Sequence, residues 1–186
     1  MDTSDFRNGI SLIMDGEIFT ITEFQHVKPG KGGAFVRSTL KNIKTGRTVD
    51  KTWRAGEKME QAILERRPMQ YLYTDGSDYF VMDPDTFDQI SVSKEQIGDG
   101  VKYLKENMEL SVLFHKGEII GIEVPSFVEL EVTETAGSEK GDTASGGGKP
   151  AVVETGAVVT VPFFVKIGDK IKIDTRKDLY LERVNS

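Results

Sequence analysis

The sequence predicts a mainly β protein made of three small domains. Short runs of alternating apolar and polar residues recur along the chain and are separated by turn pairs such as Asp15-Gly16, a pattern typical of antiparallel strands. The helical crossovers that parallel sheets require do not appear in this pattern. The length of 186 residues allows up to three small units. We expect domains over residues 1–64, 65–127 and 128–186.

The first third of the sequence predicts a small curled sheet or barrel. Asp15-Gly16 favours a type I′ hairpin turn, and a loop rich in Pro and Gly separates the next two strands. We expect strands at residues 11–14 and 18–21, a strand that ends at residue 27, and strands at residues 34–43 and 48–53. Five short strands without intervening helices favour a barrel.

The middle third predicts an OB barrel. Residues 57–67 could form a strand or a connector, and Pro68 marks a boundary. Val101, Leu104 and Met108 recur at helical spacing, so we expect one short helix within residues 98–107. Strands are expected at residues 71–73, 79–82, 89–92, 111–114 and 118–124. Several strands, one helix and a closing hairpin follow the order of an OB barrel.

The last third has the same proportions. Val128, Leu130 and Val132 alternate with polar residues and predict a half-buried strand. Further strands are expected at residues 152–153, 157–165, 170–174 and 179–184. The intervening residues 136–150, rich in Gly, Ser, Thr and Lys, have the composition of a linker. Their position within a strand pattern favours a long barrel loop, and loops of OB barrels contact nucleic acid.

The composition offers little for catalysis. The chain has no cysteine, which excludes disulfides, thiolate nucleophiles and Cys-ligated metals. His26 and His115, the only histidines, fall in different predicted domains. Asp83, Asp85 and Asp88 lack the glycine and closing glutamate of a calcium loop, so we interpret them as a turn. We therefore expect that the chain is not an enzyme and binds no metal or cofactor. The sequence shows neither a secretory signal nor an apolar run of about 18 residues, so we expect no membrane segment.

Charge is divided unevenly along the chain. The net charge of −6 argues against nucleic acid, but residues 1–64 hold 10 Lys and Arg against 8 Asp and Glu, whereas residues 65–127 hold 6 against 12. Arg37, Lys41 and Arg54 lie on the predicted basic strands. One face that meets phosphates would have this composition, and a solvated charged face is the alternative.

One loop of the basic domain has a distinctive composition. It reads Lys28-Pro29-Gly30-Lys31-Gly32-Gly33. Pro29 fixes one φ angle and the glycines admit positive φ, which leaves Lys31 as the long side chain at the apex. The loop lacks the spacing of a nucleotide-binding P-loop and leads into a strand instead of a helix. It is either a simple turn or a tip that holds Lys31 toward a polyanion.

Several stretches of the chain together carry a family resemblance. They are Asp5-Phe6-Arg7 with Gly9, the run from His26 to Phe35, Tyr71-Leu72-Tyr73, Pro125 to Leu130, Lys140 to Ala151 and Glu154 to Val165. In these stretches the sequence resembles the bacterial elongation factor P family, the counterpart of the eukaryotic factor that carries hypusine. The resemblance implies an SH3-like N-terminal barrel followed by two OB-fold barrels in an L-shaped, tRNA-like outline.

The resemblance also implies a function. The family binds both subunits of the ribosome, between the P and E sites, and relieves stalls at consecutive prolines, so we expect a monomeric, cytoplasmic factor that contacts peptidyl-tRNA. Lys31 is implied to be the site of a lysine-modifying enzyme and to reach the CCA end of the tRNA. Four residues of the later loop are implied to approach the small subunit and the codon, namely Gly141, Asp142, Thr143 and Lys149.

Two questions stay open at this point. The sequence does not select among a lysyl extension, an aminopentanol-type extension and an unmodified Lys31. A general single-stranded nucleic-acid-binding OB protein is the alternative function. It would require several aromatic residues on one OB face, and the only tryptophan, Trp53, lies in the first domain.

Overall fold

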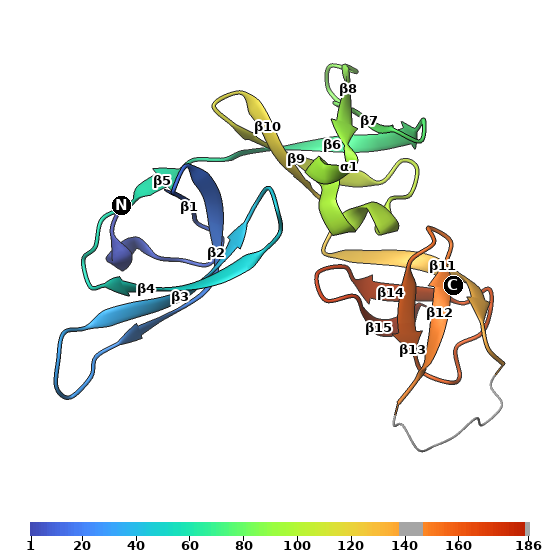
Figure 1. The fold of residues 1–186 in the computed structure, drawn as a ribbon. Coiled ribbons are helices and arrows are strands. Elements are labelled where there is room, and N and C mark those ends of the chain that lie inside the picture. Colours follow the sequence, from blue (N-terminus) through green and yellow to red (C-terminus); the bar gives the residue numbers. More distant parts are fainter. Residues whose placement is uncertain (138–146, 185–186) are drawn as a thin grey trace. The chain divides into compact units, whose positions relative to one another are not determined.

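The structure is a computed structural model that describes residues 1–137 and 147–184. It contains three five-stranded antiparallel sheets (Figure 1), which confirms the mainly β prediction. The chain divides into two compact units. One comprises Met1–Arg67 with Val112–Ile122, and the other comprises Pro68–Ser111 with Glu123–Ser186.

The first sheet has the strand order β4-β3-β2-β1-β5. Its strands are β1 (Ser11–Met14), β2 (Glu17–Val27), β3 (Phe35–Asn42), β4 (Thr48–Arg54) and β5 (Glu60–Ala62), and a short 3₁₀ helix, η1 (Thr3–Asp5), precedes them. Asp15 and Gly16 both have positive φ, at 53° and 78°, so the predicted I′ turn is confirmed. β2 is a single long strand with an irregularity between Ile21 and Glu23, where we expected two separate strands.

A buried indole organises the core of this first sheet. Trp53 is 3% exposed and packs edge-on against Phe6, with ring centroids 5.7 Å apart. Its Nε1 donates a hydrogen bond of 2.8 Å to the Oγ of Ser38, which is also buried. The polar atom of the indole therefore has a partner, and the rest of the ring contributes apolar area.

The middle sheet has the order β10-β9-β6-β7-β8. Its elements are β6 (Glu65–Thr74), β7 (Asp78–Met82), β8 (Gln89–Ser93), α1 (Lys94–Ile97), η2 (Gly98–Tyr103), β9 (Glu109–His115) and β10 (Glu118–Glu123). A helical segment between the third and fourth strands agrees with the OB prediction.

Two local features of this middle sheet differ in detail from the prediction. The helical segment begins at Lys94, not at residue 98, because Ser93 and Gln96 form a reciprocal capping box, and its second part is 3₁₀ and ends at Tyr103. Pro68 lies inside β6 and does not separate two elements, but it is the first residue of the second compact unit, so the predicted boundary is present there. Pairing with β7 begins only at Gln70, so the missing N–H of Pro68 costs this ladder no hydrogen bond.

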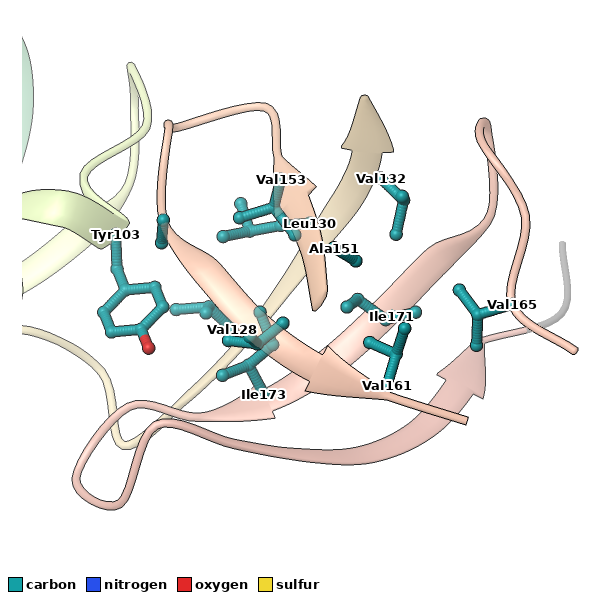
Figure 2. Packing of buried hydrophobic residues seen from close by; sticks show 12 residues of the cluster. Tyr103, Val128, Leu130, Val132, Ala151, Val153, Val161, Val165, Ile171 and Ile173 are labelled. Carbon is teal, nitrogen blue, oxygen red and sulfur yellow. The ribbon is translucent and has the colours of Figure 1, made fainter. Parts of the chain in front are cut away.

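The C-terminal sheet has the order β13-β12-β11-β14-β15. Its strands are β11 (Phe127–Thr135), β12 (Lys149–Val153), β13 (Val158–Val161), β14 (Lys170–Asp174) and β15 (Leu179–Val184). β12 begins at Lys149, inside the expected loop. β13 ends before Pro162, earlier than expected, because proline has no N–H to donate to the ladder. The alternating side chains of β11 lie in the core, as predicted (Figure 2).

Tyr103 joins the middle sheet to the C-terminal core. The side chain comes from η2, is fully buried, and packs with residues of the C-terminal strands such as Val128 and Ile173 (Figure 2). Its hydroxyl donates a hydrogen bond of 2.5 Å to the Oδ1 of Asp178, which also pairs with Lys102 at 2.9 Å. This contact could not be predicted from the sequence, since helical spacing indicated Val101, Leu104 and Met108 instead of Tyr103.

Candidate nucleic-acid interface

The Lys31 loop forms the tip of the β2–β3 hairpin. The last paired residues of the hairpin are Val27 and Phe35, and all six loop residues are exposed. In Figure 1 the loop is the blue end of this long hairpin. Lys31 therefore stands at the middle of the connection, with its ammonium in solvent and three N–H donors free for an acceptor such as a phosphate oxygen.

Only one of the three loop glycines needs to be glycine for conformational reasons. Gly32 has a φ of +109°, in the region that other residues rarely adopt. Gly30 and Gly33 are not among the residues with positive φ, and a Cβ atom at either would meet nothing within 4 Å. The loop thus keeps open space on both sides of Lys31.

The three cations predicted on the basic strands share one face of the first sheet. On β3, Arg37 and Lys41 are exposed and alternate with buried residues. Arg54 on β4 pairs with Phe35, so it points to the same side as Arg37 two residues farther along. The guanidinium of Arg37 lies 5.4 Å from the ring centroid of Phe35, which holds this cation beside the base of the loop.

An acidic pair divides this outward face. Glu23 and Asp50 both pair in register with Thr39, one from each side, and the Thr39 hydroxyl donates to Asp50 at 2.8 Å. Arg37 therefore lies on the loop side of the acids and Lys41 on the far side. Sequence counting missed this pattern, because the opposition of Glu23 and Asp50 is a matter of strand register.

The two histidines belong to different sheets. His26 is exposed on β2, and its ring packs edge-on against Phe24 with centroids 5.7 Å apart. His115 ends β9. Asp83 accepts hydrogen bonds from the backbone N–H groups of Asp85 and Thr86, so the acidic segment is the turn that was predicted.

The second predicted loop is described only in part. Gly141, Asp142 and Thr143 lie outside the described residues. Lys149 is 5% exposed, and its Nζ donates to the backbone carbonyl of Ala136. The lysine therefore ties together the two ends of the loop as they leave β11 and enter β12. Direct contact of Lys149 with RNA stays a prediction.

Residues 1–137 and 147–184 contain neither a metal-binding cluster nor a membrane-spanning helix. No group of three or more His, Asp or Glu side chains in these ranges could hold a metal ion. None of the helices described there is long and apolar enough to cross a membrane.

Comparison with known proteins gives matches along the whole chain. Three family models match in order: the elongation factor P KOW-like domain over residues 2–59, the elongation factor P OB domain over residues 64–122, and the elongation factor P C-terminal domain over residues 128–183. Each match covers most of the strands of one of the three sheets.

Individual relatives agree with these family matches. Elongation factor P of Pelotomaculum thermopropionicum is 58% identical over 184 residues, covering 99% of this chain and 100% of its own. Elongation factor P of Moorella thermoacetica is 56% identical over 183 residues, covering 98% and 99%. Among solved structures, eukaryotic translation initiation factor 5A from Methanococcus jannaschii has a TM-score of 0.49 at 23% identity, covering 66% of this chain and 94% of that one.

Proposed function

Because this chain belongs to the elongation factor P family of translation elongation factors, we propose that it binds the ribosome between the P and E sites. There it stimulates peptide-bond formation when synthesis stalls at consecutive prolines. The observation that carries the proposal is Lys31, held in solvent at the tip of the β2–β3 hairpin. The chain contacts peptidyl-tRNA and both subunits, and acts as a cytoplasmic monomer.

The proposed mechanism is positioning. Proline is a constrained partner in peptide transfer, so a productive arrangement of the P-site end is rarely reached. A donor that holds the CCA end in place lowers the entropic part of the barrier without taking part in bond making. Lys31 has the exposure for this contact, and the chemistry stays with the ribosome, so the chain itself is not an enzyme.

Modification of Lys31 fits the same geometry. A modifying enzyme must bring its own active site up to the ε-amine, and the loop backbone on either side of Lys31 offers no bulk at Gly30 or Gly33. An extension on the amine would lengthen its reach and add donors for the tRNA backbone. The added mass of the intact protein from its native host identifies the extension. Mass analysis of the peptide that contains Lys31 localises the extension to this residue.

The remaining predicted contacts divide by position. Arg37 and Arg54 lie beside the base of the loop and would hold tRNA phosphates close to Lys31, while Lys41 lies beyond the acidic pair. The loop with Gly141, Asp142 and Thr143 would approach the small subunit and the codon. We assign Lys149 a positioning part there, since its ammonium is engaged with the carbonyl of Ala136.

The test is a translation assay on a template that encodes three consecutive prolines. The unaltered chain, modified as in its host, should relieve the stall, and Lys31→Ala should reduce relief to the level without factor. Lys44→Ala is the matched control, because Lys44 is also an exposed lysine between β3 and β4, and it should retain relief. Failure of the unaltered chain to relieve the stall would refute the function. Full relief by Lys31→Ala would refute the role of Lys31.

A further inference from the structure

The outward face of the middle sheet carries a stacked aromatic pair. Tyr73 on β6 pairs in register with Phe80 on β7, and their rings stack with centroids 4.8 Å apart and planes 22° apart. Val81, next to Phe80 on β7, is buried, so Phe80 points away from the core. An irregularity in β6 between Tyr71 and Tyr73 places Tyr73 on the same side as Phe80, although Tyr71 is buried. Tyr73 is 47% exposed.

Apolar side chains extend this face toward the β7–β8 loop. Met82 lies two residues beyond Phe80 on β7 and points to the same side, opposite Gln70 and Gln89 on the neighbouring strands. Phe87, in the loop itself, is 70% exposed. We call the residues Tyr73, Phe80, Met82 and Phe87 the aromatic patch.

The segment of the chain that carries the aromatic patch has charges of one sign. From Pro68 to Ser93 the sequence contains no Lys, Arg or His and five aspartates, at positions 75, 78, 83, 85 and 88. Hydrogen bonds from the backbone N–H groups of Asp78 and Ser77 hold the pKa of Asp75 below its usual value. These turns therefore present carboxylates at the ends of the strands that carry the patch.

This combination of aromatic and acidic residues excludes one familiar ligand. The strand face of an OB barrel is where such folds bind oligonucleotides, and exposed aromatic rings provide stacking platforms for bases. Affinity for nucleic acid, however, comes mainly from cations that neutralise phosphates. A segment of 26 residues that has five aspartates and no cation repels a phosphate backbone.

We propose that the aromatic patch is the docking site for a basic protein surface, one rich in Lys and Arg. Exposed Tyr, Phe and Met are typical of the core of protein interfaces, and a few such residues carry most of the binding energy. The aspartates complement basic side chains and accelerate encounter, and the rings accept cation–π contacts from them. The inference rests on the proposed function, which sets the docking among the basic proteins of the ribosome.

Binding of the full chain to purified ribosomes with peptidyl-tRNA in the P site tests this proposal. The double variant Tyr73→Ser/Phe87→Asn removes two aromatic side chains of the aromatic patch. It spares the fold, because both positions are exposed and Asn tolerates the φ of +63° at Phe87. We expect its dissociation constant to rise at least about tenfold. Tyr73→Phe, which keeps the ring, and Leu181→Ser, on a C-terminal strand and 45% exposed, should stay within about twofold.

The class of partner is read by cross-linking. Photoreactive p-benzoylphenylalanine in place of Phe87 is activated on the same ribosomes, and the adduct is digested with nuclease and with protease. An adduct on a Lys- and Arg-rich protein segment supports the proposal. An adduct on RNA, or equal binding by the Tyr73→Ser and Phe87→Asn variant, overturns it while leaving the proposed function intact. Failure of the unaltered chain to bind ribosomes overturns both.

Discussion

Replacing Tyr103 with phenylalanine tests the link between the middle sheet and the C-terminal core. The change keeps the buried ring and removes only the hydroxyl that donates to Asp178 at 2.5 Å. A hydrogen bond to a charged group contributes about 1.5–3 kcal/mol. The Asp178 side chain is 49% exposed and keeps Lys102 as a partner, so the freed carboxylate is rehydrated, and we expect a loss of about 1 kcal/mol.

The assay for this variant uses two spectroscopic signals from one urea titration. Tyr103 lies in the unit that begins at Pro68, whereas the only tryptophan, Trp53, lies in the other unit. With a denaturant slope of about 2 kcal/mol/M, the far-ultraviolet circular dichroism midpoint should fall by about 0.5 M and the Trp53 fluorescence midpoint should not move. Tyr180→Phe, at a half-buried ring against the same core, is the control and should change neither.

The predicted effect of Tyr103→Phe depends on pH. The hydrogen bond from Tyr103, and then that from Lys102, lower the pKa of Asp178. A carboxylate with a lowered pKa in the folded state contributes stability above its unfolded pKa of about 3.9, and this contribution is lost as pH falls through the folded pKa. The difference between the two proteins should therefore be complete at pH 7 and shrink below about pH 4. A difference that persists unchanged at pH 2, or a Trp53 transition that moves as far as the dichroism, would refute the reasoning.

Two further substitutions address individual packing contacts. Gly148→Ala would place a Cβ atom 2.7 Å from the carbonyl oxygen of Val161 and should lower the free energy of unfolding followed by dichroism by about 1–3 kcal/mol. Gly137→Ala, with open space around it, should not lower it, and equal effects of the two substitutions would contradict the clash. Ser38→Ala leaves the buried Trp53 N–H without its partner and should cost about 1–3 kcal/mol in the Trp53 fluorescence transition. An unchanged transition would show that the indole finds another acceptor.

Local patterns in the sequence were sufficient to locate most of the strands and to predict that the Lys31 loop is exposed. The alternation of Val128, Leu130 and Val132 predicts a half-buried strand because strand geometry places successive side chains on opposite faces. The exposure of Lys31 follows from its neighbours, since a proline and three glycines within six residues favour a turn and supply no large apolar side chain to a core. These features depend on residues within a few positions of one another.

Features that depend on distant residues could not be predicted. The burial of Tyr103 requires the C-terminal strands to close around it, and its partner Asp178 lies 75 residues away in the sequence. The opposition of Glu23 and Asp50 depends on the register of three strands. The burial of Lys149 depends on where β12 begins. Each is set by tertiary pairing, which overrides local preference.

The division of charge along the chain connects the two proposals. The net charge of −6 is a sum over sheets of different charge. The outward face of the first sheet carries Arg37 and Arg54, whereas the charged residues of the middle sheet between Pro68 and Ser93 are all aspartates. Phosphates attract the first face and repel the second, and basic protein does the reverse. In a particle built of both RNA and basic protein, the first face therefore favours RNA and the second face favours protein. If both proposals hold, net charge is a poor guide to the partner, because the chain then meets two partners of opposite charge with different sheets.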